Sequence, residues 1–315
     1  MSKNPVSLRG KNILGLEDFS PEEIQLVLDS AKGMKNVIHR DIKKLPTLRG
    51  KSIVTLFYEP STRTRSSFEL AGKYLGADVV NITAGTSSIV KGESLRDTLL
   101  TVEAMGVDAI VMRHKAEGAA AYATQVVSPV IINAGDGAHA HPSQGLLDLF
   151  TILQYKNTLR GLKVAIIGDI FHSRVARSNI YVLKTLGAKV KLFGPPMFLT
   201  GMEAFGCQIC SDMREAIENS DVIIMLRIQL ERQDDEIAFP SVREYSKFFG
   251  LTQAKMKYAK EGVMILHPGP INRGVEINSD VADDPRYSHV LNQVENGVAV
   301  RMAILDTLIK NKGAK

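Results

Sequence analysis

The sequence predicts an α/β protein of two domains, each a parallel β-sheet flanked by helices, with the active site in the cleft between them. At 315 residues the chain is about twice the size of a usual domain. Short apolar runs rich in β-branched residues alternate with helix-length segments, which is typical of parallel strands joined by crossover helices. Eight such runs are many for one open sheet, so we expect two sheets of about four strands each. The expected strands are Ser52–Phe57, Asp78–Ile82, Ala109–Met112, Val130–Asn133, Val164–Gly168, Val190–Phe193, Val222–Leu226 and Val263–Leu266.

A break in the strand and helix pattern gives the domain boundary. Pro142–Tyr155 is expected to form a helix with leucines along one side, and the polar stretch Asn157–Gly161 separates it from the next strand. A last helix, Val294–Leu308, is expected to pack back on the first domain. The expected domains are 1–150 together with a C-terminal helix within 294–315, and 151–293.

Composition and charge narrow the class of protein. Hydrophobic residues make up 44% of the chain and charged residues 23%, which is ordinary for a soluble α/β protein and unlike a disordered one. The 39 Lys and Arg residues against 34 Asp and Glu residues give a net charge of +5, but they form no basic block, which favours small acidic substrates over nucleic acid. No apolar run reaches signal-peptide or membrane-spanning length, so we expect a cytoplasmic protein without a membrane partner.

The cysteines form one CxxC motif, Cys207 and Cys210. One such pair supplies half of a four-ligand zinc site, and no second pair exists in the sequence. The alternation of Cys207 and Ile209 indicates a strand, whereas a redox motif would begin a helix. We therefore expect buried or half-buried structural thiols.

The stretch EPSTRTRSSFE follows the first expected strand. Ser61 is expected to be the N-cap of a helix whose first turn holds Thr62, Arg63 and Thr64. First-turn N–H groups and the helix dipole favour a phosphate, and Arg63 adds a bidentate fork. Arg65, two residues further on, faces another side of the helix. The alternative interpretation of this stretch alone is an ordinary capped helix with solvated arginines.

The motif STRTRSSFE resembles the phosphate motif of the carbamoyltransferase family, whose members include aspartate and ornithine carbamoyltransferases. The resemblance extends from about residue 10 to residue 310. It implies a first domain that binds carbamoyl phosphate and a second that binds an amino acid. Further motifs follow in the family's order, namely TSSIVKGESLRDT (86–98), VMRH (111–114), HPSQGLLDL (141–149), SRVARS (173–178), LRIQLER (226–232) and LHPGPINRG (266–274).

The resemblance also implies which residues contact carbamoyl phosphate. Thr64, Arg113 and His141 match residues that contact the carbonyl oxygen, where negative charge develops. Gln144 and the carbonyls of Pro268 and Gly269 would hold the carbamoyl amine. Carbamoyl phosphate is already activated, so an amine attacks it directly and no covalent intermediate is needed. The expected catalytic residues are Arg63, Thr64, Arg113 and His141, and the expected carbamoyl phosphate site is Ser61, Thr62, Arg63, Thr64, Arg113, His141, Gln144, Gly269 and Pro270.

The residues that depart from the ornithine pattern favour aspartate as the second substrate. Ornithine members typically carry HCLP where this chain has HPGP (267–270), and a Ser-Met pair where it has LRIQ (226–229). Arg227 and Gln229 suit a dicarboxylate better than a cationic amine. Arg174 follows the strand Val164–Gly168, so two arginines from different loops can clamp two carboxylates. The expected product is N-carbamoyl-L-aspartate, an intermediate of pyrimidine biosynthesis.

Lys91 completes the expected aspartate site and lies in a polar Gly/Ser/Thr-rich segment, residues 84–94. Taken alone, that segment reads as a mobile surface loop. The resemblance implies that Ser87 and Lys91 reach the neighbouring subunit's site, in a homotrimer with intersubunit active sites. Association with a regulatory chain or with a dihydroorotase partner is an open possibility.

No cofactor and no metal are expected. A dinucleotide site would require GxGxxG, and AIIGDIFHSR offers only Gly168. His114 and His139 lie near the motifs, but their spacing does not repeat on one helix face and we expect no acidic partner to accompany them. A carbamoyltransferase for another amine and a non-catalytic homologue that serves as a scaffold remain as alternatives.

Overall fold

The structure is a computed structural model that describes residues 6–83, 92–228 and 241–309. The chain divides into two compact units, Met1–Phe150 with Val294–Lys315, and Thr151–Gln293. Each unit contains one parallel sheet with helices against it, which confirms the predicted α/β fold of two domains. Within the described ranges, no helix is both long and apolar enough to span a membrane.

The sheet of the first unit has the strand order β2-β1-β3-β4, with every neighbouring pair parallel. The four predicted strands are present, and three of them run further than predicted. In β3 the extension includes Arg113, which pairs with Phe57 at the end of β1. The carboxyl ends of the central strands therefore bring polar residues to one edge of the sheet. The strands are β1 (Ser52–Phe57), β2 (Asp78–Thr83), β3 (Ala109–His114) and β4 (Val130–Asp136).

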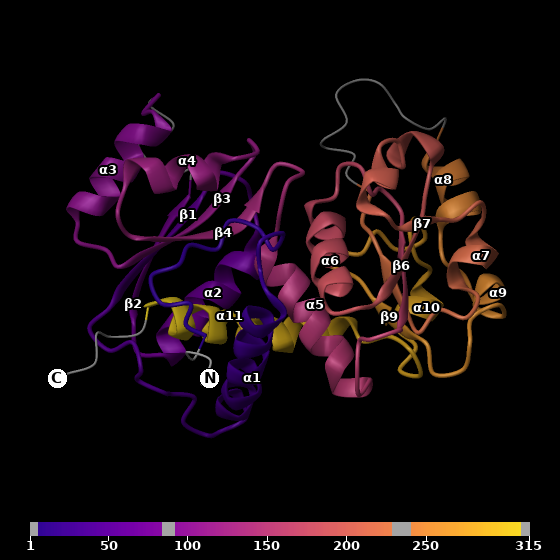
Figure 1. Ribbon diagram of the computed structural model, residues 1–315, viewed down its shortest axis with the longest axis horizontal. Coiled ribbons are helices and arrows are strands. Elements are labelled where there is room, and N and C mark those ends of the chain that lie inside the picture. The colour runs from indigo at the N-terminus through magenta and orange to yellow at the C-terminus, as the bar shows by residue number, and fades with distance from the viewer. Residues whose placement is uncertain (1–5, 84–91, 229–240, 310–315) are drawn as a thin grey trace, which may run out of the picture. The chain divides into compact units, whose positions relative to one another are not determined.

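Helices cover both faces of this sheet (Figure 1). On one face, Leu99 of α3 and Ala123 of α4 pack into a buried cluster with Leu56 and Ile110. On the other face α2 lies so close that a Cβ atom on Gly72 would be 2.5 Å from Val79 Cγ2 of β2 and 4.0 Å from Leu305 Cδ1 of α11. The helices of this unit are α1 (Pro21–Ile38), α2 (Thr62–Tyr74), α3 (Leu95–Ala104) and α4 (Ala119–Val126), together with most of α5 (Pro142–Tyr155) and of α11 (Val290–Ile309), both of which extend into the second unit.

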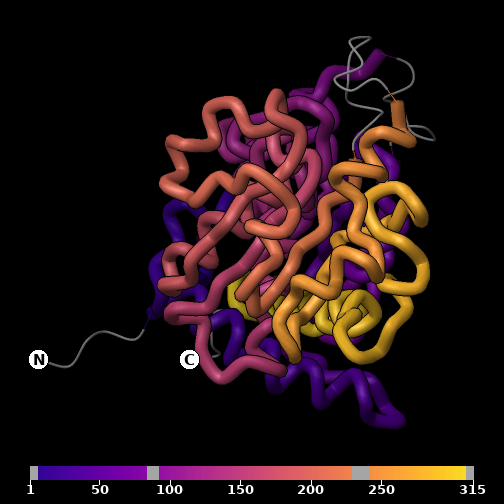
Figure 2. The backbone as a smooth tube through the Cα atoms, turned by 90° about the vertical axis from the view of Figure 1, so that its right-hand side faces the viewer, coloured from indigo at the N-terminus to yellow at the C-terminus, as the bar shows by residue number. Residues whose placement is uncertain are grey.

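The C-terminal helix α11 lies beside the N-terminal part of the chain (Figure 2). Lys35 Nζ of α1 donates to Asn296 Oδ1 at 2.9 Å, and the Gly10 amide donates to the Leu308 carbonyl at 3.0 Å. The helix begins four residues before the predicted Val294, at Val290. Its first turn, VLNQ, mixes polar with apolar residues, so the apolar pattern alone hides the start.

The sheet of the second unit has five strands in the order β7-β6-β5-β8-β9, all parallel. The fifth, β7, lies at the edge between Cys207 and Cys210. It is too short for the apolar runs to reveal, although the alternation at Cys207 indicates it. Cys207 is half-buried and Cys210 buried, as predicted, and burial raises the pKa of Cys210 to about 11. The strands are β5 (Lys163–Ile167), β6 (Lys189–Phe193), β7 (Gln208–Ile209), β8 (Val222–Met225) and β9 (Met264–Leu266).

Helices also lie on both sides of the second sheet, with α6 on one side and α7, α9 and α10 on the other (Figure 1). Met213 of α7, Met256 of α9 and Val281 of α10 join one buried cluster with Ala165 and Ile223 of the sheet. These helices are α6 (Arg174–Thr185), α7 (Met213–Ile217), α8 (Val242–Phe249), α9 (Gln253–Met256) and α10 (Ser279–Ala282), and the 3-10 helices are η3 (Pro196–Phe198) and η4 (Met202–Phe205).

Candidate active site

The helix α2 begins at Thr62 with Ser61 as its N-cap residue, as predicted. The Ser61 side chain makes no capping hydrogen bond, so only its position and not its hydroxyl serves the cap. The Ser61 carbonyl accepts from the Arg65 amide at 3.1 Å, which closes the first turn. No acidic residue occupies that turn. The positive end of the helix dipole is therefore not offset by a carboxylate of the same turn, which suits an anion.

The two arginines of α2 have different electrostatic neighbours. Arg63 is exposed and interacts with Arg301 of α11. Arg65 is half-buried and interacts with Glu69, one turn further along the helix. Thr64 lies between them in sequence, is only 6% exposed, and its carbonyl accepts from Ser67 Oγ at 3.0 Å. Arg63 is therefore the better placed of the two to meet a ligand.

Arg113 lies at the carboxyl end of β3, next to the point where β1 leads into α2. Its carbonyl accepts from the Tyr58 amide at 2.9 Å. Its Nε lies 3.3 Å from Glu59 Oε2, and its Nη1 donates to the Ala134 carbonyl at 3.4 Å. Glu59 was not predicted to take part. Its position directly before Pro60, at the end of a buried strand, is the sequence feature that could have indicated its role.

His141 and Gln144 occupy the start of α5, which follows β4. The His141 carbonyl accepts from the Gln144 amide at 2.9 Å and from the Gly145 amide at 3.2 Å, so it closes the first turn. Both side chains are mostly buried, at 5% and 7% exposed. Gln144 Nε2 donates to Asp148 Oδ1 at 2.8 Å, which fixes the orientation of the amide.

The loop between β4 and α5 is held by a charged cluster that the sequence motifs do not indicate. Asp136 Oδ1 accepts from Asn133 Nδ2 at 2.7 Å and from the Ala140 amide at 3.2 Å. His139 Nδ1 lies 3.1 Å from Asp136 Oδ1, and its Nε2 lies 3.1 Å from Glu17 Oε1. Hydrogen bonds to these two carboxylates raise the pKa of His139 to about 10. The imidazolium thus fixes the loop that leads to His141.

The expectation that no acidic partner accompanies His139 is therefore wrong, because folding brings Asp136 and Glu17 to its ring. His114 Nδ1 accepts from the Ala116 amide at 2.9 Å. Among the described residues, no three His, Cys, Asp or Glu side chains are grouped as metal ligands.

In the second unit, Arg174 and Arg227 follow neighbouring strands. Ile167 pairs with Met225 at the carboxyl ends of β5 and β8, so the loops after these strands start side by side. Arg174 is the first residue of α6, behind the N-cap Ser173, and is 3% exposed. Arg227 is half-buried, two residues after β8. The structure thus brings the starts of the two arginine-bearing loops to the same edge of the sheet.

The backbone at this edge is tightly packed around Gly168. A Cβ atom there would lie 3.0 Å from Tyr245 Oη, 3.1 Å from the Leu226 carbonyl oxygen and 3.2 Å from Leu226 Cβ. The φ angle of Gly168 is +127°, a backbone conformation that residues other than glycine rarely adopt. The glycine serves the contact between the ends of β5 and β8 and the approach of α8.

The segment HPGP follows β9 and is anchored through His267. His267 Nδ1 accepts from the Gly269 amide at 2.8 Å, so the ring proton is on Nε2, which donates to Glu276 Oε1 at 3.1 Å. Both His267 and Glu276 are fully buried. The same Oε1 accepts from the Asn272 amide at 2.6 Å. Pro268 and Gly269 are half-buried, so the pair holds a loop that is itself partly open to solvent.

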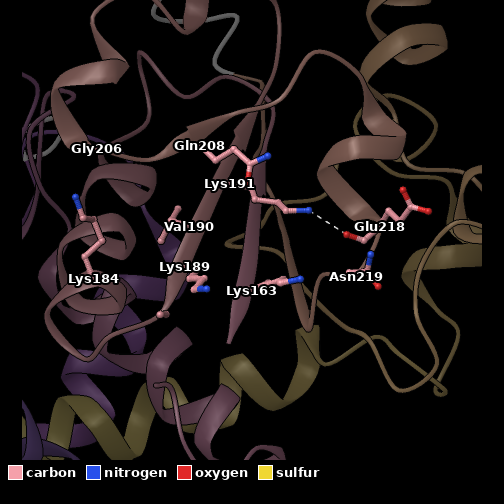
Figure 3. Close-up of a pocket in the computed structure, with 10 residues that line it drawn as sticks. Lys163, Lys184, Lys189, Val190, Lys191, Gly206, Gln208, Glu218 and Asn219 are labelled. Carbon is pink, nitrogen blue, oxygen red and sulfur yellow. Dashed lines mark hydrogen bonds between the residues drawn. The ribbon is translucent and has the colours of Figure 1, made fainter. Parts of the chain in front are cut away.

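The predicted site residues Ser87, Lys91 and Gln229 lie outside the described residues. Two cavities formed by described residues of the second unit include none of the predicted site residues. One of about 530 Å³ lies at the amino-terminal ends of β5 and β6 and includes Lys163 and Lys189 (Figure 3). Another of about 940 Å³ lies at the ends of β6 and β7. The loops with Arg174 and Arg227 are at the opposite edge of the sheet from the lysine-lined cavity.

Two family models together match nearly the whole described chain. Residues 11–154 match the carbamoyl-phosphate-binding domain of aspartate/ornithine carbamoyltransferases. Residues 160–308 match the Asp/Orn-binding domain. The chain belongs to the aspartate/ornithine carbamoyltransferase family. The resemblance predicted from the motifs is thereby confirmed.

Curated relatives agree with this membership. The aspartate carbamoyltransferase catalytic subunit of Campylobacter fetus subsp. fetus is 58% identical over 302 residues, covering 96% of this chain and 97% of the relative. That of Geobacter sulfurreducens is 58% identical over 302 residues, covering 95% and 96%. These relatives confirm the prediction of an enzyme of the aspartate carbamoyltransferase type.

Solved structures of family members share the fold. Aspartate transcarbamoylase from Trypanosoma cruzi, in complex with carbamoyl phosphate, is 33% identical with a TM-score of 0.86 and covers 97% of this chain and 99% of its own. Ornithine carbamoyltransferase from Pyrococcus furiosus is 30% identical with a TM-score of 0.83, covering 98% and 100%. Because both kinds of enzyme share the fold, the fold does not decide the second substrate.

Proposed function

We propose that this protein transfers the carbamoyl group of carbamoyl phosphate to the α-amine of L-aspartate, giving N-carbamoyl-L-aspartate and phosphate. The observation that carries the proposal is the placement of Arg174 and Arg227 after the paired ends of β5 and β8. Two guanidinium groups from adjacent loops match the two carboxylates of aspartate, whereas the cationic side chain of ornithine would be repelled. Relatives named aspartate carbamoyltransferase support the same choice.

The phosphate of the donor would bind at the start of α2. First-turn N–H groups, the hydroxyls of Ser61, Thr62 and Thr64, and the guanidinium of Arg63 offer donors to its oxygens. The absence of an acidic residue in that turn keeps the local field positive. Arg113, held by Glu59 and the Ala134 carbonyl, adds a second cation beside the end of β1.

The carbonyl group would lie where Thr64, Arg113 and His141 can all donate. As the amine attacks, negative charge grows on the carbonyl oxygen, and preorganised donors stabilise it without further rearrangement. A neutral imidazole N–H of His141 suffices for this role, so no acid catalysis by this residue is required. The carbamoyl NH2 would donate to Gln144 Oε1 and to the carbonyls of Pro268 and Gly269.

Aspartate would be clamped by Arg174 and Arg227, which leaves its α-amine directed at the carbonyl carbon. A C–N bond forms, the bond from carbon to the bridging phosphate oxygen breaks, and the departing phosphate takes the proton of the attacking amine. Because carbamoyl phosphate is an activated acyl donor, positioning and charge stabilisation carry the rate, and no side chain acts as a nucleophile.

Gln229 and Lys91 complete the proposed aspartate site, and Ser87 with Lys91 would come from a neighbouring copy in a homotrimer. These residues are assigned by family resemblance. A regulatory chain or a dihydroorotase partner is compatible with this arrangement.

The experiment is a steady-state assay of phosphate release from carbamoyl phosphate by the purified full-length protein, with aspartate, ornithine and putrescine in parallel. Saturable release with aspartate, and with neither of the other two amines, is the expected result. Release driven by ornithine or putrescine would overturn the aspartate assignment. No release with any of the three would favour a non-catalytic homologue.

A further inference from the structure

A buried carboxylate outside the proposed site lies one helical turn after Gln144. Asp148 of α5 is fully buried, and its Oδ1 accepts from Gln144 Nε2 at 2.8 Å. An amide hydrogen bond offsets only part of the hydration that a buried carboxylate loses. A positive charge close to Asp148 is therefore expected on physical grounds.

Arg301 of α11 supplies that charge. Its side chain is 4% exposed, and its guanidinium carbon lies 5.2 Å from the centre of the Phe68 ring of α2. A Cβ atom on Gly297 would lie 2.6 Å from Arg301 Nη1 and 3.3 Å from Leu147 Cδ2. The guanidinium is therefore enclosed by α2, α5 and α11, next to the turn that contains Asp148.

The electrostatics of Arg301 agree with this geometry. Burial lowers the pKa of Arg301 to about 10, Asp148 acts in the opposite direction, and Arg63 lowers it further. At neutral pH the guanidinium is still charged. Arg301 thus lies within electrostatic reach of both Asp148 and the arginine proposed to bind phosphate.

The hydrogen bond from Gln144 to Asp148 determines which end of the amide can meet a ligand. A glutamine amide carries an acceptor oxygen and a donor nitrogen, and an ionised carboxylate is an acceptor only. Reversing the amide would place Oε1 against the carboxylate and lose the hydrogen bond. The hydrogen bond to Asp148 therefore leaves Gln144 Oε1 pointing away from the carboxylate. This oxygen can accept a hydrogen bond from an NH2 group but not from a methyl group.

We propose that Asp148, buried beside Arg301, is a positioning residue that sets the amide of Gln144 and so makes the site select carbamoyl phosphate over acetyl phosphate. The two acyl phosphates differ in having NH2 or CH3 on the carbonyl carbon, while their phosphate groups and carbonyl oxygens are the same. This inference rests on the proposed function, because it assumes that carbamoyl phosphate binds at Gln144.

The test measures dissociation constants of carbamoyl phosphate and acetyl phosphate for the full-length wild type and for Asp148→Asn. The variant keeps the side-chain shape, but its amide can present a donor to Gln144 and allow the reversed orientation. We expect the wild type to prefer carbamoyl phosphate. In the variant that preference should fall by about 5- to 100-fold, in line with the cost of an unmatched buried polar group. The acetyl phosphate constant should change little.

A purely structural role of Asp148 predicts another result, since both constants would then rise by the same factor, and that outcome overturns the inference. Arg301→Lys, which retains the charge, should keep most of the preference, and Arg301→Met should lose it. Equal wild-type affinity for the two acyl phosphates overturns the inference alone and needs no variant. A wild type that binds neither overturns the proposed function and this inference with it.

Discussion

Replacing Gly168 by alanine tests the packing that joins the ends of β5 and β8. The new Cβ would lie 3.0 Å from Tyr245 Oη and 3.1 Å from the Leu226 carbonyl, at a φ of +127°. Backbone strain in such a region costs about 1–3 kcal/mol, and overpacking a full interior costs about 1–3 kcal/mol more. We therefore expect Gly168→Ala to lower the free energy of unfolding by about 2–6 kcal/mol.

Gly161→Ala is the matched control. Gly161 lies shortly before the other end of the same strand, has a φ of +80°, and a Cβ there would have no neighbour within 4 Å. Only the left-handed backbone term remains, about 1–2 kcal/mol. The difference between the two variants contains the contact with Leu226 and Tyr245 together with the difference in backbone strain between φ angles of +127° and +80°.

The assay is urea unfolding followed by far-ultraviolet circular dichroism, because the chain has no tryptophan to report by fluorescence. Protein concentration is held fixed, since any association between copies would shift the midpoint. Leu226 directly precedes Arg227, so Gly168→Ala should also raise the Michaelis constant for aspartate while carbamoyl phosphate binding is unchanged. Equal destabilisation by the two variants, with an unchanged aspartate constant, would refute the reasoning.

Three further predictions follow from individual side chains. Arg63→Ala should reduce the turnover number by about 100- to 1000-fold because a hydrogen-bond donor to the phosphate is lost. Arg65→Ala, the control on the same helix, should reduce the turnover number by less than about tenfold. Equal losses in the two variants would contradict the choice of Arg63. Arg227→Ala should raise the aspartate Michaelis constant by about 10- to 100-fold with carbamoyl phosphate affinity unchanged, and a loss of carbamoyl phosphate binding instead would place Arg227 elsewhere. The pKa of His139 is raised in the folded state from 6.5 to about 10, so its stabilisation is full below 6.5 and is lost as pH rises toward 10. The stability difference between wild type and His139→Gln should accordingly shrink over that range in urea unfolding at several pH values, and a difference that grows with pH would contradict the assignment.

The elements that the sequence predicts best are those with strong apolar contrast. Ser52–Phe57 and Pro142–Tyr155 are found with the predicted bounds, because a buried strand and a leucine-lined helix have unambiguous patterns. The two-residue strand β7 shows the limit, since it contains too few residues to establish a period. The start of α11 shows the same limit for a helix whose first turn mixes polar and apolar residues.

The candidate site divides in a similar way. Ser61 could be assigned as a cap because local sequence determines helix starts, and the structure confirms that position. The partners of the site residues could not be predicted. Glu17 meets His139 across 122 positions of sequence, and Arg301 comes to Asp148 from a different helix. Such pairs depend on tertiary packing, which periodicity and capping do not encode.

The most direct test of the account is a crystal structure of the full-length protein with N-(phosphonacetyl)-L-aspartic acid, the compound found with the Trypanosoma cruzi enzyme. The account predicts that the phosphonate contacts the first turn of α2 at Thr64 and that the two aspartate carboxylates contact Arg174 and Arg227. A ligand whose carboxylates are held instead by Lys163 and Lys189, at the amino-terminal edge of the second sheet, would contradict it.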